Sequence, residues 1–69
     1  MKKTIKIDGM SCEHCAKKVE LALKSIAEVK KVKVHLKKKE AIVILDASVE
    51  NQVLTSTIGN LGYQVIEIL

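Results

Sequence analysis

Residues 4–26 read TIKIDGMSCEHCAKKVELALKSI, and the spacing of the apolar side chains changes within this stretch. Ile5 and Ile7 alternate with polar residues, which is the pattern of a strand with one buried face. From position 16 onward the apolar residues recur every three or four positions, which predicts an amphipathic helix. The connecting residues 9–15, GMSCEHC, hold the only two cysteines of the chain.

The apolar pattern that follows this helix predicts a β-hairpin. Val32, Val34 and Leu36 alternate with positively charged and polar residues, so we expect a second half-buried strand here. Residues 37–40, KKKE, provide a polar turn, and residues 41–45, AIVIL, provide a third strand. The hairpin therefore joins a lysine-rich strand to a more apolar one.

A second helix and a fourth strand complete the expected order. We expect Ser48 to be the N-cap of this helix and Gly62 to adopt a left-handed conformation where it stops. The expected inner face of the helix consists of Val53, Leu54, Thr57, Ile58 and Leu61. Residues 64–68 form the last strand, in which three apolar side chains leave the register open. The order βαββαβ predicts an α+β domain, with an antiparallel sheet and both helices on one face.

The length and charge of the chain limit how many domains it has and which partners it can bind. With 69 residues and no proline, it is expected to be one domain, residues 1–69, with a small core. The net charge of +4 comes from lysine, and six of the twelve lysines lie in residues 30–39. Because there is no arginine and only one aromatic residue, direct nucleic-acid binding is not expected. The lysines fit either a solvated face or a surface that meets an acidic protein.

The open face of the predicted sheet carries this charge. If Val43 and Leu45 point inward, Ile42 and Ile44 share the open face with Lys31 and other lysines. Two exposed isoleucines are either ordinary scatter or part of a docking surface, and the sequence leaves both alternatives open.

No segment of the sequence predicts export or membrane insertion. Residues 1–3, MKK, are not followed by an apolar stretch of seven residues, because Lys6 and Asp8 interrupt it. The longest apolar run, residues 41–45, is too short to span a bilayer. We therefore expect a cytoplasmic protein whose thiols stay reduced, so that a metal or redox role is favoured over a structural disulfide.

The cysteine pair is the candidate metal site. We expect Cys12 in the loop and Cys15 in the first helical turn, where free backbone N–H groups and the helix dipole favour thiolate. Lys17 and Lys18 are expected to add weaker help. Gly9 allows an unusual backbone angle next to the site.

The ligand set favours one metal over others. Two thiolates suit Cu(I), which accepts two sulfur ligands, whereas Zn(II) normally requires four ligands. Ser11, the residue before Cys12, offers no carboxylate oxygen that would favour Zn(II) or Cd(II). We therefore predict one Cu(I) per monomer on Cys12 and Cys15, and no organic cofactor.

In residues 9–15, 29–32 (VKKV) and 61–63 (LGY), the chain resembles the heavy-metal-associated (HMA) domain family. Within this family it is similar to the small bacterial copper chaperones of the CopZ type. The resemblance spans nearly the whole chain and implies a ferredoxin-like fold. It also implies a carrier rather than an enzyme. The implied acceptors are the N-terminal domain of a copper-transporting P-type ATPase and a copper-responsive repressor.

Four further residues need an interpretation, and three of them allow two. Met10 is either a thioether ligand or, as we favour, a core residue under the loop. His14 is either a third ligand or a residue that does not bind the metal, and we favour the second interpretation. In that case it is a bystander or it modulates the pKa values of the cysteines. His35 is expected to be solvated among lysines. By resemblance, Tyr63 lies in a loop next to the metal site, where shielding or hydrogen bonding to a sulfur competes with simple packing.

Several other functions remain as alternatives. A thiol–disulfide oxidoreductase is disfavoured because the chain is short and has no proline. A domain excised from a P-type ATPase is disfavoured by the Met1 start and the Leu69 end, with no linker on either side. Carriers of mercury, zinc or cadmium share the expected fold. Two exposed sites could also share Cu(I) through four cysteines, which would give a copper-bridged homodimer.

Overall fold

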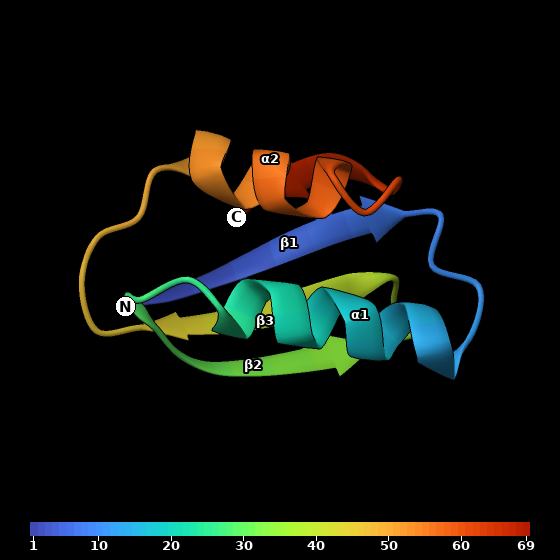
Figure 1. Ribbon diagram of the computed structural model, residues 1–69, viewed down its shortest axis with the longest axis horizontal. Helices are drawn as coiled ribbons and strands as arrows, with labels where there is room; N and C mark the ends of the chain where they lie inside the picture. Colours follow the sequence, from blue (N-terminus) through green and yellow to red (C-terminus); the bar gives the residue numbers. More distant parts are fainter.

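The computed structural model describes residues 1–69 and contains six elements in the predicted order. They are β1 (Lys2–Asp8), α1 (Glu13–Lys24), β2 (Val29–His35), β3 (Glu40–Leu45), α2 (Asn51–Gly59) and β4 (Gln64–Ile68). The strands form one sheet in the order β2-β3-β1-β4, and every neighbouring pair is antiparallel. Both helices cover the same face of this sheet (Figure 1). The predicted α+β, ferredoxin-like βαββαβ fold is therefore confirmed.

The core lies between the helices and the covered face of the sheet. It contains thirteen buried apolar residues: Ile5, Ile7, Met10, Val19, Leu23, Val29, Val32, Ala41, Val43, Leu45, Val49, Leu54 and Ile58. Val43 and Leu45 point inward, which is the condition under which Ile42 and Ile44 were expected on the open face. Ile42 and Ile44 are half-buried on the opposite face of the sheet, so the alternation in β3 was interpreted correctly.

The start of α2 differs from the prediction. Its N-cap is Glu50 rather than Ser48, and the helix begins at Asn51. Ser48 is exposed, and its hydroxyl lies 3.7 Å from Met1 Sδ. Val49 follows Ser48, and its side chain is buried in the core. The N-cap is therefore Glu50, two residues later than the capping pattern at Ser48 predicted.

The inner face of α2 is narrower than predicted. Leu54 and Ile58 are fully buried, Thr57 and Leu61 are half-buried, and Val53 is 45% exposed. The prediction for Val53 was wrong because a nine-residue helix contacts the sheet along a single i, i+4 stripe. Gly62 has φ +94° as expected of a left-handed glycine, but it lies in the loop beyond the Asn60 C-cap.

The turn of the β2–β3 hairpin lies one residue earlier than predicted, at residues 36–39 rather than 37–40. Glu40 belongs to β3, and Leu36 lies in the turn rather than in β2. Lys39 takes φ +55° there, and its carbonyl accepts a hydrogen bond from the backbone N–H of Ile7 at 2.8 Å. This bond fixes the hairpin to the end of β1, at the same end of the molecule as the loop that holds the cysteines (Figure 1).

The register of β4, which the sequence left open, is set by a β-bulge. Lys6 pairs with Glu67 and Ile7 pairs with Val65, so β1 advances by one residue while β4 advances by two. Ile66 has no partner in β1 and is 61% exposed. The extra residue allows Val65 and Ile68, three positions apart, to pack against the same core.

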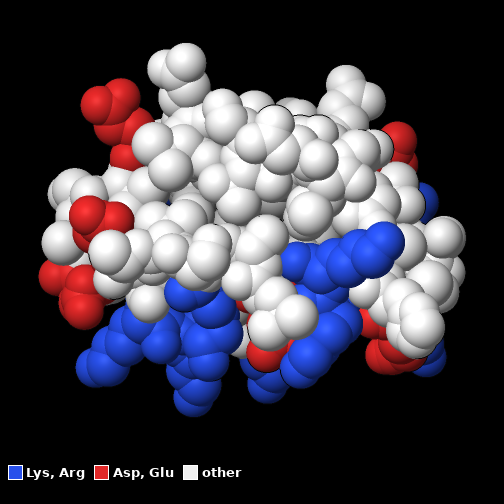
Figure 2. All heavy atoms as spheres, in the orientation of Figure 1, with Lys and Arg blue, Asp and Glu red and all other residues white.

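Charge is distributed unevenly over the surface. Lysines gather along the lower part of Figure 2, over α1 and β2, whereas the surface over α2 is free of charge apart from its ends. On the open face of the sheet, Lys6 Nζ lies 2.6 Å from Glu40 Oε1, and this contact lowers the pKa of Glu40. Neither helix is long and apolar enough to cross a bilayer.

Candidate metal centre

The loop between β1 and α1 is held close to the α2–β4 connection. Gly9 has φ +106°, a conformation that residues with a side chain rarely adopt. A Cβ atom at this position would also lie 3.2 Å from Cδ1 of Tyr63. Glycine is therefore required here for both its backbone angle and its small size, and the close approach brings Tyr63 to the cysteine loop.

The structure brings the two predicted site residues together. Cys12 is the N-cap of α1, with an extended backbone, and its side chain is exposed. Cys15 lies in the first turn of the helix and is half-buried. The two Sγ atoms are 3.7 Å apart, and both thiols are free. The pair can therefore converge on one ion at the surface of the protein.

The pKa of Cys15 is lowered from 9.0 to about 6. The largest cause is a hydrogen bond from the Tyr63 side chain, followed by a backbone hydrogen bond from Ser11. Burial opposes the shift, and contacts with Cys12 and the Ser11 side chain add to it. A pKa near 6 leaves about ten thiolates for each thiol at pH 7, so Cys15 is prepared to act as a ligand.

Tyr63 is placed where it acts on the sulfur. Its own pKa is raised, chiefly by the hydrogen bond to Cys15, as expected of a hydroxyl that donates to a negatively charged neighbour. It is also half-buried and packs against the core. The side chain therefore packs against the core and also contributes to the lowered pKa of Cys15.

The source of the lowered pKa differs in part from the expectation. Lys17 and Lys18 are exposed, and neither contributes to the shift at Cys15. Ser11 does contribute, although the sequence drew attention to it only as a missing carboxylate. Its Oγ atom lies 3.9 Å from Cys15 Sγ. The sequence could have indicated this contact, because Ser11 precedes Cys15 by four residues, which is about one helical turn.

The remaining candidates take different positions. Met10 is 7% exposed and belongs to the core cluster, which agrees with the packing interpretation. His14 is exposed on the first turn of α1, and His35 is half-buried on the open face of the sheet. No group of three or more His, Cys, Asp or Glu side chains is arranged to hold a metal ion. The ligand set that this chain offers at the loop is therefore the cysteine pair.

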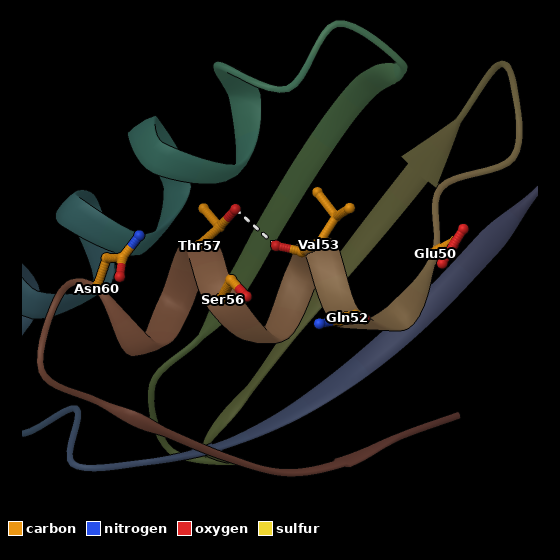
Figure 3. A pocket seen from close by; sticks show the side chains of 6 residues that line it. All are labelled: Glu50, Gln52, Val53, Ser56, Thr57 and Asn60. Atoms are coloured by element: carbon orange, nitrogen blue, oxygen red, sulfur yellow. Dashed lines mark hydrogen bonds between the residues drawn. The ribbon is translucent and has the colours of Figure 1, made fainter.

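The one hollow on the surface lies away from these thiols. It is a shallow depression of about 420 Å³ along α2, lined by Glu50, Gln52, Val53, Ser56, Thr57 and Asn60 (Figure 3). Its lining contains no cysteine or histidine, and one hydrogen bond within it, from Thr57 Oγ1 to the Val53 carbonyl, belongs to the helix. This hollow offers no soft ligand, so the candidate site is the exposed loop.

Comparison with known proteins gives consistent matches. The family model for the heavy-metal-associated domain matches residues 4–64. The copper chaperone CopZ of Enterococcus hirae is 46% identical over 65 residues, which cover 93% of this chain and 94% of that protein. A probable copper-exporting P-type ATPase of Archaeoglobus fulgidus is 31% identical over 97% of this chain, but this covers only 8% of the ATPase. A solved structure of a CopZ metallochaperone superimposes with a TM-score of 0.90 at 31% identity, covering 96% of this chain and all of that one.

Proposed function

Since this chain belongs to the heavy-metal-associated domain family, we propose that it is a cytoplasmic copper chaperone and not an enzyme. In this proposal the single domain, residues 1–69, binds one Cu(I) through Cys12 and Cys15 and passes it to an acceptor protein. The observation that carries the proposal is the exposed pair of free thiols, 3.7 Å apart, in a chain similar to copper chaperones.

The choice of Cu(I) rests on the number and type of ligands. Cu(I) is a soft ion that two thiolates satisfy, whereas Zn(II) takes four ligands in a structural site. No His, Asp or Glu side chain joins Cys12 and Cys15 in a group that could hold a metal ion. Zinc would therefore need two ligands from water or from another molecule, and copper would not.

The exposure of the site supports transfer by ligand exchange. A thiolate of the acceptor adds to the two-coordinate ion, which becomes three-coordinate, and one of the two Cu–S bonds to this chain then breaks. Cu(I) is neither oxidised nor reduced, and the released sulfur departs as a thiolate. Cys12 is the more exposed of the two thiols, so we expect its bond to break first while Cys15 remains with Tyr63. No free ion is needed at any stage.

The acceptor is proposed on similarity and charge. The match to part of a copper-exporting P-type ATPase supports the N-terminal domain of such a pump as one acceptor. A copper-responsive repressor is the other. Lys31 and Lys33 lie exposed on the open face of the sheet, where they pair with the half-buried Ile44 and Ile42 of β3. We propose that this lysine face docks against an acidic surface of the acceptor, so reversing both charges should slow transfer and reduce its salt dependence.

The test is a competitive titration of the metal-free, reduced protein with Cu(I), Zn(II) and Hg(II) against chelators of known affinity. We expect a preference for Cu(I) over Zn(II), and a loss of Cu(I) affinity of more than about 100-fold in Cys12→Ser or Cys15→Ser, because losing a ligand exceeds the 10–100-fold cost of losing its supporting contacts. His14→Ala, in the first turn of α1 between the two cysteines, is the matched control and should change affinity only slightly. Stronger retention of Zn(II) than of Cu(I) would contradict the proposal.

Transfer itself needs a separate measurement. Metal-loaded protein mixed with an acceptor that retains a single cysteine should give a bridged complex that gel filtration detects. Transfer that occurs only through ion released to solvent, and that a chelator intercepts completely, would contradict ligand exchange.

A further inference from the structure

The two edges of the sheet are protected to different extents. β2 and β4 are the outer strands (Figure 1). Lys30, Lys31 and Lys33 are exposed along β2, and lysines on an edge strand discourage pairing with another chain. β4 has no lysine, and Glu67 is its only charged residue. The β4 edge is therefore the one on which another strand can be added.

The backbone of β4 leaves hydrogen-bonding groups free on this edge. Leu69 exchanges both of its backbone hydrogen bonds with Thr4, at 2.8 and 3.0 Å. In an antiparallel pair the next residue then directs its N–H and C=O to the opposite side, so those of Ile68 point away from β1. No strand of this chain lies on that side.

The bulge in β4 places an apolar side chain at the centre of the same edge. Ile66 is the residue that the pairing with β1 passes over, and it is 61% exposed. Leu69 follows at the end of the strand and is 65% exposed. An added strand would therefore find both free backbone groups and apolar surface.

The charge distribution favours a second copy of this chain as the occupant. Two molecules of charge +4 repel each other, most strongly where their lysines face each other. Residues 51–66 contain no charged side chain, and they form α2 and the first part of β4. The upper surface in Figure 2, over α2, is accordingly uncharged between its ends. Two copies that approach each other on this side keep their lysines apart.

We propose that β4 pairs antiparallel with β4 of a second copy, which gives a weak homodimer that forms without metal. Such an interface is isologous, because one strand supplies both halves of the hydrogen-bond pattern. A twofold axis at Ile66 sets the two Ile66 side chains opposite each other. It also sets Val65 opposite Glu67 of the second copy, so that the two glutamates stay apart. The cysteines take no part, which separates this dimer from a copper-bridged one.

The first experiment is sedimentation equilibrium of the metal-free, reduced protein at concentrations up to about 1 mM. The weight-average mass should rise from 7.6 kDa toward twice that value. We expect a dissociation constant on the order of 0.1–1 mM, because a five-residue strand gives an interface at the small end of the known range. The double variant Cys12→Ser/Cys15→Ser should dimerise equally well. A protein that remains monomeric at 1 mM, or a dimer that this variant abolishes, would overturn the proposal.

A matched pair of variants locates the interface. Ile66→Lys places like charges opposite each other at the twofold axis and should weaken the dimer by more than about tenfold. Leu21→Lys adds the same charge at a residue of nearly equal exposure, 58%, on α1, and should change it by less than about twofold. Equal weakening by both variants would contradict the β4 interface. Concentration-dependent amide shifts of the unmodified protein, expected at residues 64–68, provide a readout that no substitution can disturb.

Discussion

The two helices cover the same face of the sheet and bury the same number of residues, yet their outer surfaces differ. α1 buries Val19 and Leu23, and α2 buries Leu54 and Ile58. The outer surface of α1 carries Cys15, three lysines and two glutamates, with Glu13 in the first turn and Lys24 in the last, as the helix dipole favours. α2 carries no charged residue.

This difference shows that packing constrains only one stripe of each helix. Both inner stripes meet the sheet with two fully buried aliphatic side chains, which supply stability. The outer stripes are free to differ, so the α1 side carries the thiol and the charge, and the α2 side carries a neutral surface. Tyr63 from the α2–β4 loop connects the two regions, because it lowers the pKa of Cys15 in α1.

The largest expected effect tests whether the inner stripes are equivalent. Leu23→Ala and Leu54→Ala each remove a fully buried side chain, one under each helix. Each should lower the free energy of unfolding by about 2–5 kcal/mol, because burial is lost and a cavity remains. Urea denaturation of the metal-free protein measures both. A large cost at one helix and none at the other would show that one helix contributes little to the core.

The matched controls are the exposed neighbours Leu21→Ala and Val53→Ala. They are 58% and 45% exposed, so each should change the free energy of unfolding by no more than about 0.5 kcal/mol. A cost at Val53 similar to that at Leu54 would show that the inner face of α2 is as wide as the sequence pattern suggests.

The second prediction concerns the contact between the two regions. In Tyr63→Phe the ring remains and the hydroxyl is lost, so the pKa of Cys15 should rise from about 6 toward 9.0. The rate of alkylation of Cys15 in the metal-free variant Cys12→Ser, measured against pH, reports this midpoint. Ser11→Ala should raise it less, because its side chain is the smallest cause of the shift. An unchanged midpoint in Tyr63→Phe would show that the hydroxyl does not act on the sulfur.

The same pKa predicts how stability depends on pH. The pKa of Cys15 is lower in the folded protein, about 6, than the ordinary value of 9.0. Between these values the unfolded chain binds more protons, so the stability from this thiol is fully present above pH 9 and lost as pH falls through 6. The difference in urea midpoint between the metal-free protein and Cys15→Ser should therefore change over this interval. A difference that is independent of pH would contradict the lowered pKa.

The smallest expected effect tests the charged outer stripe of α1. Lys17 Nζ lies 3.8 Å from Glu20 Oε1, and both side chains are partly exposed. Such an i, i+3 pair contributes about 0.2–0.5 kcal/mol, which salt screens. Glu20→Gln should cost this amount at low ionic strength and almost nothing in 1 M NaCl. Lys17→Gln removes the other partner and should show the same salt dependence, and a cost that persists in 1 M NaCl would show that the pair is not the cause.

Most of the fold and the thiol pair could be predicted from periodicity and spacing. The alternation at Ile5 and Ile7 and in β3 identified the covered face correctly, because a strand with one buried face must alternate. The start of α2 was missed because Ser48 offered a capping pattern while burial of Val49 decided the path of the chain. The β4 register could not be predicted, since a bulge at Ile66 breaks the alternation on which such a prediction depends.

The sequence by itself determined the element order, the left-handed glycines and the placement of both cysteines at the start of a helix, because these depend on local spacing and backbone preference. Only the tertiary structure decided what acts on the thiols. Tyr63 is 48 positions away from Cys15 in the chain, and it reaches the sulfur because Gly9 lets the two loops approach closely. A hydrogen bond between distant segments depends on how the sheet is assembled, and no local pattern records it.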